Sequence, residues 1–278
     1  MTLVVCWRDG TELTVAADTR VSGEGLAGAR VYTDSGPKIL QSPIVVHQPR
    51  GRSVRRRAYA NIGFAFAGST LIAHSVHAMA STCLQNLSGD VGKPGPSLLE
   101  VADLYMNCGV QYTREMLFWR PGQYPAFEAF IFGYCPHLKD LLVYHLRTTV
   151  DSGVVNIRHD GHYVESGSAL HIGSGVQEYV RIHEEYKARG KAISAFETFE
   201  LVLTGTNVSS VGGSRQYARA TRHGVELVPA LIPSEGDGYN GRVEVLGCDI
   251  NQLGTVGDYA IGHTLIGPHP NNTVRPYT

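Results

Sequence analysis

Thr2 is the residue whose chemistry is best supported by its type and position. If Met1 is removed, Thr2 carries a hydroxyl nucleophile and a free α-amino group on one residue. An α-amino group has a reference pKa of about 7.7 to 8.0, so near neutral pH part of it is unprotonated and can take the hydroxyl proton. We therefore predict that Thr2 is a nucleophile whose own amine acts as the base.

Two charged residues are expected to lie beside Thr2. The apolar runs 2–7 and 13–17 flank an Asp-Gly turn pair, a pattern that predicts a β-hairpin. This hairpin returns Asp18 to the amino terminus, and a third strand that starts near Lys38 brings the lysine to the same place. A lysine ammonium within about 4 to 6 Å lowers the pKa of an amine, while the aspartate keeps the lysine charged.

Several short segments follow Thr2 in an order that resembles a known family. They are AADTRVSG at 16–23, Lys38 at its strand start, AGST at 67–70 and IGSG at 172–175. In order and spacing, over most of the first 230 residues, the chain resembles the N-terminal threonine (Ntn) hydrolases of the proteasome β-subunit and bacterial HslV type. The resemblance implies an α+β fold, a four-layer α-β-β-α sandwich, and a peptidase that assembles into stacked rings.

The resemblance also implies catalytic roles for further residues. The backbone N–H of Gly68 would stabilise the oxyanion, and one such donor is typically worth about 2.7 to 4 kcal/mol. Ser174 would hydrogen-bond the terminal amine and help to pass its proton, with Asn207 and Ser210 in support. The family usually has an aspartate at the position of Asn207, and one residue fewer before the glycines that follow.

Four residues are expected to contact the substrate. The resemblance places Val21 and Ser22 along the cleft, and Phe66 and Thr70 at the pocket for the side chain before the scissile bond. From the residues alone, the same segments also fit plainer structures. These are a flexible loop over 21–40, a tight turn at 68 and a helix N-cap at 174.

The composition argues against other classes of function. A chain of 278 residues that is 43% hydrophobic can bury a large core, and its net charge of −1 gives no overall attraction to nucleic acid or membrane. Five cysteines without a Cys-x-x-Cys pair indicate neither a disulfide framework nor a zinc site. No apolar run reaches 18 residues and no signal peptide is recognisable, so we expect a cytoplasmic protein without a metal or cofactor.

The order of predicted elements agrees with the sandwich. Apolar spacing and capping-box patterns predict helices over 71–87, 97–117, 176–188 and 194–203, with strands before, between and after the two pairs. Residues 1–231 are expected to form one domain. Residues 232–278 are expected to be a C-terminal extension that packs on the domain or on a neighbouring subunit.

Two polar clusters have more than one interpretation. Five arginines between residues 50 and 57 separate two apolar strands, which predicts a hairpin insertion. We favour a solvated tip over RNA contact because no aromatic residues interleave the arginines, and a partner's acidic face or a neighbouring subunit stays an alternative. His159 and His162 flank an Asp-Gly pair, so we predict a hairpin turn there rather than a metal site.

Three functions are compatible with the sequence. The first is a self-compartmentalising threonine endopeptidase that cleaves unfolded polypeptides, with a separate ATP-driven unfoldase as a candidate partner. The second is an Ntn amidase or acyl-transferring enzyme with a small-molecule or single-protein substrate, since a fold does not determine a function. The third is a non-catalytic ring scaffold that keeps Met1.

Overall fold

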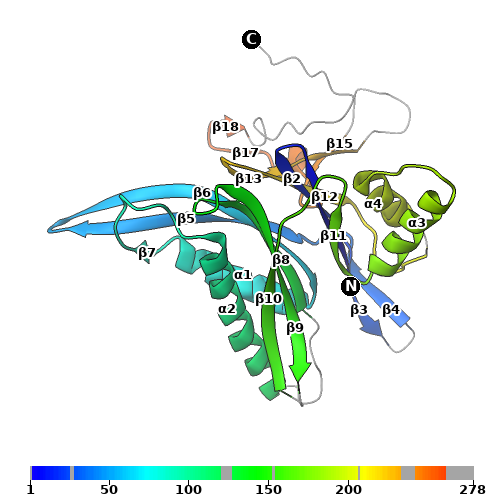
Figure 1. Cartoon of the computed structure of the whole chain (residues 1–278), viewed down its shortest axis with the longest axis horizontal. Coiled ribbons are helices and arrows are strands. Elements are labelled where there is room, and N and C mark those ends of the chain that lie inside the picture. Colours follow the sequence, from blue (N-terminus) through cyan, green and yellow to red (C-terminus); the bar gives the residue numbers. More distant parts are fainter. Residues whose placement is uncertain are drawn as a thin grey trace, which may run out of the picture.

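The computed structural model describes residues 2–25, 28–119, 127–151, 154–205, 207–232 and 242–260. The chain is a mixed α+β protein dominated by strands, as predicted (Figure 1). The helices are α1 (Thr70–Leu84), α2 (Leu98–Trp119), α3 (Val176–Ala188), α4 (Ala195–Thr204) and the 3-10 turn η1 (Ile250–Gln252).

Most strands belong to two large antiparallel sheets. The first has the order β11-β1-β2-β12-β13 and consists of β1 (Leu3–Asp9), β2 (Glu12–Asp18), β11 (Ala169–Gly173), β12 (Arg215–Thr221) and β13 (Gly224–Val228). The second has the order β10-β9-β8-β6-β5-β7 and consists of β5 (Ile39–Arg50), β6 (Ser53–Gly68), β7 (Leu87–Ser88), β8 (Phe127–Cys135), β9 (Asp140–Asp151) and β10 (Val154–His162). Within it, the short strand β7 pairs with β5 in parallel.

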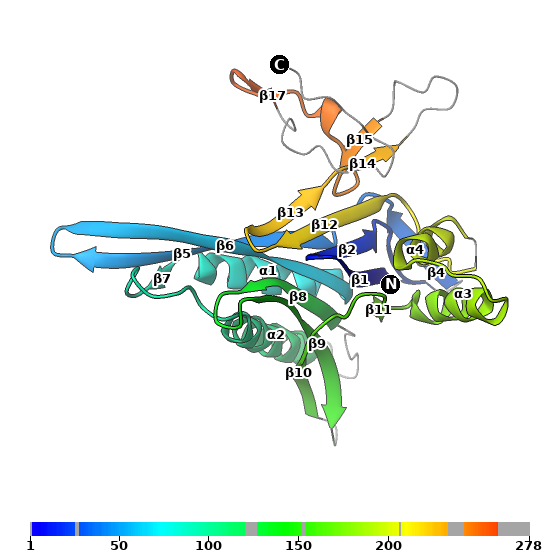
Figure 2. The same ribbon diagram turned by 45° about the horizontal axis from the view of Figure 1, so that its top comes forward.

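The remaining strands form small sheets. They are β3 (Val21–Gly25) with β4 (Gly28–Thr33), then β14 (Ala230–Ile232), β15 (Arg242–Val245) and β16 (Cys248–Asp249), and finally β17 (Thr255–Val256) with β18 (Tyr259–Ala260). Figure 2 shows β14 to β18 on one side of the two large sheets. The turn between β15 and β16 lies close to the domain, because a Cβ atom at Gly247 would be 3.0 Å from Thr19.

Strand β1 shows how the apolar alternation builds the core. Val4 and Cys6 point toward the second sheet and pack in a cluster with Phe130 and Phe132 of β8. Leu3 and Val5 point the other way, toward α3 and α4. Because successive side chains on a strand face opposite sides, a strand that is apolar at every position is buried on both faces.

Helices α1 and α2 cover the outer face of the second sheet. Phe64 and Phe66 of β6 pack against Val76 of α1 and Tyr105 of α2 in one buried cluster. The helices α3 and α4 cover the first sheet in the same way (Figure 1). The arrangement follows the predicted order of elements, in which strands alternate with two pairs of helices, and α2 also covers β8 to β10, which come after it.

The helix starts agree with the predicted capping boxes. Ser97 Oγ accepts a hydrogen bond from Glu100 N, and the Glu100 carboxylate accepts one from Ser97 N. Ser194 and Glu197 make the same reciprocal pair at the start of α4. Such pairs satisfy backbone donors that a helix leaves free at its N-terminus.

The turn predicted at residues 159–162 was wrong. These residues form the end of β10, which pairs with β9 from Val154 to His162. Gly161 lies opposite Tyr144, and a Cβ atom there would be 2.9 Å from the tyrosine ring. His159 Nε2 lies 2.7 Å from Asp103 Oδ1. The glycine is therefore required by a close approach across the sheet, not by a turn.

The predicted division at residues 231 and 232 stays a prediction. Residues 233–241 and 261–278 of the expected extension lie outside the described residues. In the part of the chain that the structure describes, no helix is long and apolar enough to span a membrane.

Candidate active site

The strand pairing of β1 brings the ends of two other strands to Thr2. Leu3 pairs with Gly173 of β11 and Val4 pairs with Ala17 of β2, so the end of each partner strand lies beside the start of β1. Thr2 itself is buried, with 3% of its surface exposed. We call this group of strand ends, with Asp18, Lys38, Ser174 and Ser210, the Thr2 corner.

A buried ion pair lies at the centre of the Thr2 corner. Lys38 Nζ lies 2.9 Å from Asp18 Oδ1, and both side chains are almost completely buried. Asp18 also accepts hydrogen bonds from the backbone N–H groups of Leu3, Arg20 and Gly212. The carboxylate therefore has four donors, which is how a protein keeps a buried charge satisfied.

Burial and pairing act in opposite directions on these two groups. Burial lowers the pKa of Lys38, and the adjacent Asp18 carboxylate opposes that change. Burial raises the pKa of Asp18, while the Lys38 ammonium and the backbone donors favour its ionised form. Because Asp18 Oδ1 bonds both Lys38 Nζ and Leu3 N, the lysine is linked through one atom to the residue that follows Thr2.

Two serines connect to the backbone nitrogen of Thr2. This nitrogen donates to Ser174 Oγ at 3.2 Å, and Ser174 Oγ lies 3.0 Å from Ser210 Oγ. Ser174 immediately follows β11 and Ser210 lies in the loop before β12. The arrangement is a chain of exchangeable protons that starts at the Thr2 nitrogen.

Two glycines allow the turn after β11 to approach Thr2. Gly173 has a φ of 98°, and a Cβ atom there would lie 2.1 Å from the Thr2 carbonyl oxygen. Gly175 donates its N–H to the same oxygen at 3.3 Å, and a Cβ atom on it would be 2.7 Å from Leu3. Gly173 combines this close approach with a positive φ, whereas Gly175 has an ordinary φ of −78° and is favoured only by the close approach.

Gly68 lies at the junction between β6 and α1. Its φ is 92°, a conformation that favours glycine, and the next residue, Ser69, caps α1 by accepting from Ile72 N. Ala67, just before it, lies near the Thr2 corner, since a Cβ atom at Gly173 would be 3.1 Å from that of Ala67. The role of the Gly68 N–H stays a prediction.

The predicted substrate-contacting residues are placed in different surroundings. Val21 and Ser22 lie on β3, Thr70 is the first residue of α1, and all three are half-buried. Phe66 is only 1% exposed, and its ring packs on Phe64 at 5.8 Å between the ring centroids. The Phe66 ring therefore packs in the core under α1, and its predicted place at the substrate pocket stays a prediction.

Asn207 is not joined to the Thr2 corner by any of its described contacts. Its Nδ2 donates to Glu178 Oε1 at 2.7 Å, which links the loop after α4 to the first turn of α3. Arg181 and Asn207 together lower the pKa of Glu178 to about 2. The amide thus has a structural contact, and its predicted role in orienting the amine stays a prediction.

Gln216 is the main residue that the sequence analysis missed. Its side chain is buried, accepts from the N–H groups of Lys38 and Ile39, and donates to the carbonyl of Gly36. It thereby holds the start of β5 against β12. A signal was present in the sequence, because Gln216 occupies an inward position of an alternating strand where Ala218 and Ala220 follow.

Two pockets lie away from Thr2. One of about 190 Å³ lies between β6, β8 and the loop before α2. The other, of about 600 Å³, is lined by the end of β1 and by residues of α3 and α4.

The comparisons with known proteins concern the fold. No protein-family model matches the chain, and no curated protein matches it. Several solved structures, in contrast, have a similar fold. The helical assembly of the Anbu complex from Pseudomonas aeruginosa shares 13% identity over 86% of this chain and 89% of that chain, with a TM-score of 0.53. Anbu (ancestral beta-subunit) from Yersinia bercovieri shares 14% over 81% and 86%, with a TM-score of 0.51.

These similarities correct the family suggested by the motifs. The chain resembles Anbu proteins, which have a proteasome-like fold but form a family distinct from HslV, so the assignment to the proteasome β-subunit and HslV-type family was wrong. The motifs misled because they mark strand ends and turns of the common fold. At this level of identity the comparison establishes an Anbu-like fold and nothing about activity.

Proposed function

We propose that this protein is a threonine-type hydrolase that cleaves peptide bonds, with Thr2 as its nucleophile after removal of Met1. The observation that carries the proposal is the hydrogen bonding of Asp18 Oδ1, which links the buried Lys38 ammonium to Leu3 N. A buried lysine held beside the amino terminus by a fully satisfied carboxylate costs stability, and catalysis gives a reason to keep it.

The mechanism uses groups of the Thr2 corner. The Thr2 hydroxyl attacks the substrate carbonyl while the α-amine takes its proton, which then passes to the leaving amine. Lys38 keeps the α-amine unprotonated through its positive charge, and Ser174 with Ser210 carries protons to and from the nitrogen. The N–H of Gly68 receives the oxyanion. Water then hydrolyses the ester and releases the threonine.

We extend the proposal to the architecture and assembly. The two sheets with a helix pair on each outer face make a four-layer α-β-β-α sandwich. One similar solved structure is described as a helical assembly of the Anbu complex, which supports a homo-oligomer for this chain. In a ring or helical assembly the enclosed active sites would act on unfolded polypeptide, delivered by a separate unfoldase.

Intact mass spectrometry tests the nucleophile. The purified protein is measured with and without a threonine-directed epoxyketone or β-lactone. We expect loss of Met1 and a single adduct that maps to Thr2 by peptide sequencing. Thr2→Ala should fold, as judged by an unchanged unfolding transition, and should give no adduct. Retained Met1 without an adduct would overturn the proposal and favour a non-catalytic scaffold.

A substrate panel tests the reaction class. Blocked fluorogenic peptides and small amides are compared on the wild-type protein and on Thr2→Ala. We expect cleavage of peptides by the wild-type protein alone. Turnover of a small amide with every peptide left intact would contradict the peptidase proposal and favour an amidase.

A further inference from the structure

The strands β6 and β8 diverge and leave an open backbone edge. β8 pairs with β6 only from Gly63 to Gly68, whereas β5 pairs with β6 from Ser53 to Ala65. Within the described part of the chain, residues 53–62 of β6 therefore have a backbone partner on one side alone. We call this segment the free edge. An unpaired edge presents a row of N–H and C=O groups that can accept another strand.

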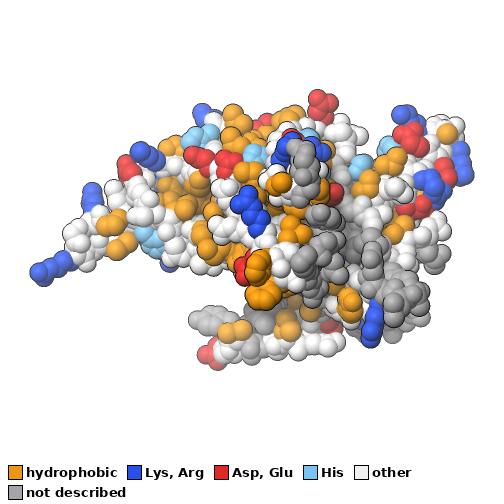
Figure 3. All heavy atoms as spheres, turned by 90° about the horizontal axis from the view of Figure 1, so that it is seen from below, with side chains coloured by type: hydrophobic (Ala, Val, Ile, Leu, Met, Phe, Trp, Pro, Cys, Tyr) orange, Lys and Arg blue, Asp and Glu red, His pale blue; other side chains and the backbone are white. Residues whose placement is uncertain are grey.

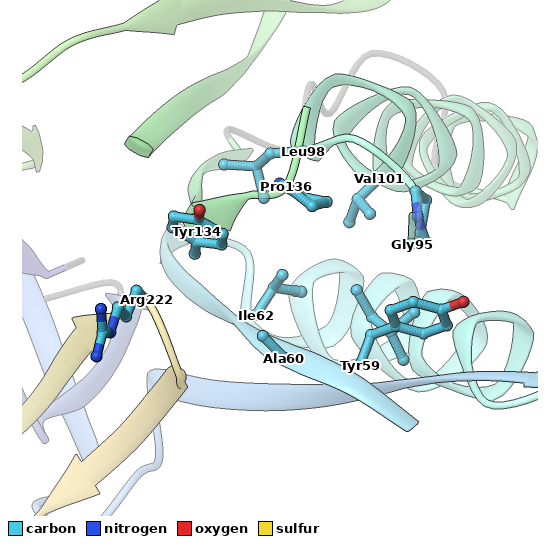
Figure 4. A pocket seen from close by; sticks show the side chains of 11 residues that line it. Tyr59, Ala60, Ile62, Gly95, Leu98, Val101, Tyr134, Pro136 and Arg222 are labelled. Carbon is cyan, nitrogen blue, oxygen red and sulfur yellow. The ribbon is translucent and has the colours of Figure 1, made fainter. Parts of the chain in front are cut away.

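An apolar pocket lies where the two strands part. Tyr59 and Ile62 of β6 face Leu98 and Val101 of α2 across it, with Tyr134 of β8 on a third side (Figure 4). Its volume of about 190 Å³ exceeds that of an apolar cavity of about 150 Å³ that holds benzene. The pocket is therefore large enough for one large apolar side chain at the end of the free edge.

Beyond the pocket, β5 and β6 continue as a basic arm over residues 49–58. Every residue of this arm is exposed, and the arm projects from the body of the molecule (Figures 1 and 3). Arg50, Arg52, Arg55 and Arg56 have no ion-pair partner among the described residues. In the fifth arginine, Arg57, the guanidinium carbon lies 4.7 Å from the centroid of the Tyr59 ring, and the guanidinium donates a hydrogen bond to the Val91 carbonyl.

Protection against aggregation does not explain the whole arrangement. Charged residues on an edge strand commonly block unwanted pairing. Protected edge strands are commonly very short, whereas here the strands are 12 and 16 residues long. A two-stranded hairpin is marginally stable alone. A long arm also exposes more unpaired backbone than a short one. Protection against aggregation therefore does not account for its length.

We propose that the free edge of β6 binds an extended acidic segment of a partner protein. The segment adds as a strand to residues 53–62, inserts one large apolar side chain into the pocket, and places acidic side chains along the basic arm. The main-chain hydrogen bonds would give affinity, while the pocket and the arginines would select the sequence. The inference concerns a docking surface and does not depend on the chemistry of Thr2.

Two other occupants fit the observations less well. Pairing of two copies along their free edges would bring ten arginines together, and like charges on paired strands repel. RNA binding without base stacking would rest on charge alone. The Tyr59 ring beside the arm is covered by Arg57, and a Cβ atom at Gly95 would be 2.7 Å from it.

Fluorescence anisotropy tests the proposal on the full chain carrying Thr2→Ala, so that cleavage does not interfere. The probe is a fluorescein-labelled nine-residue peptide with a central leucine and glutamate at every other position. We expect binding that weakens with salt, as charge contacts do. Replacing the leucine by serine, or alternate glutamates by proline, should each weaken binding by about tenfold or more, a loss of about 1.4 kcal/mol.

Protein variants locate the site. Arg55→Glu with Arg56→Glu should weaken binding by about tenfold or more, and Ala60→Met should do the same by filling the pocket. The matched control is Lys187→Glu with Lys191→Glu, two exposed charges near the end of α3, and it should leave binding within about twofold. All variants should keep the wild-type unfolding temperature.

Several results would overturn the proposal. They are equal binding by the serine or proline peptides, equal loss in the Lys187 and Lys191 control, and no binding of the acidic peptide at all. Tighter binding of a uridine oligonucleotide than of the peptide, with the same dependence on Arg55 and Arg56, would show a nucleic-acid site instead. Self-association that Ala60→Met abolishes would show that a second copy of the chain fills the pocket.

Discussion

The charged side chains of the Thr2 corner and of the basic arm differ in burial and in pairing. In the corner, Lys38 and Asp18 are buried, paired, and surrounded by backbone donors. In the arm, four arginines are exposed and have no carboxylate partner among the described residues. A buried charge is tolerated only when it is satisfied inside the protein, whereas an exposed charge is satisfied by water until a partner arrives. The contrast is in keeping with the internal role proposed for the first region and the external role proposed for the second.

Removing Asp18 should have the largest effect. Asp18→Ala leaves the Lys38 ammonium buried without its partner, and breaking a buried pair in this way costs about 3 to 5 kcal/mol of unfolding free energy. Urea unfolding measures the change. Asp34→Ala is the control, because its pair with Arg20 is about half exposed on the aspartate side and should contribute about 0 to 1 kcal/mol. Equal effects of the two changes would refute the contrast between buried and exposed pairs.

Gly173→Ala should be the next most damaging change. Its Cβ atom would lie 2.1 Å from the Thr2 carbonyl oxygen, and its positive φ adds backbone strain of about 1 to 3 kcal/mol. Gly167→Ala separates the two causes, because Gly167 has a φ of 84° and no atom within 4 Å of an added Cβ. We expect both to lose stability, and only Gly173→Ala to lose the Thr2 adduct as well.

Ser174→Ala should slow the reaction with little change in folding. Ser174 Oγ accepts from the Thr2 nitrogen and contacts Ser210, so its loss removes a proton carrier while the ion pair stays intact. We expect a fall of about 10²-fold in the rate of peptide cleavage, at the low end of the usual contribution of proton transfer. Ser168→Ala, an exposed serine that bonds only Glu165 O among the described contacts, should leave the rate unchanged.

Local signals predicted most of the fold. Turn pairs, capping boxes and apolar alternation depend on residues close in the sequence, and the helices and the first hairpin follow them. The Asp-Gly pair at 160–161 failed because a tyrosine on the neighbouring strand determines that position. A register across a sheet cannot be read from four residues.

The site was harder to predict because its contacts are distant in the sequence. Gln216 meets Lys38 across 178 positions, and Gly212 meets Asp18 across 194. Asp18 and Lys38 were expected to meet because the predicted hairpin and the strand after Lys38 lead both to the amino terminus, although β2 and β5 belong to different sheets. The partner of Asn207 was not expected, since a loop contact to α3 has no local pattern.

Neutralising the arm should have the smallest effect on stability. Arg52→Gln with Arg55→Gln should change the unfolding free energy by no more than about 0.5 kcal/mol, since exposed side chains without partners add little. Lys38→Gln replaces a basic residue by glutamine in the same way at the Thr2 corner. It should lower the unfolding free energy several times more, because it leaves the buried Asp18 carboxylate without its ion-pair partner. Urea unfolding of the two proteins gives the comparison directly. A large loss from the arm substitution would mean that its arginines stabilise the fold, and the argument for an external acidic partner would then lose its basis.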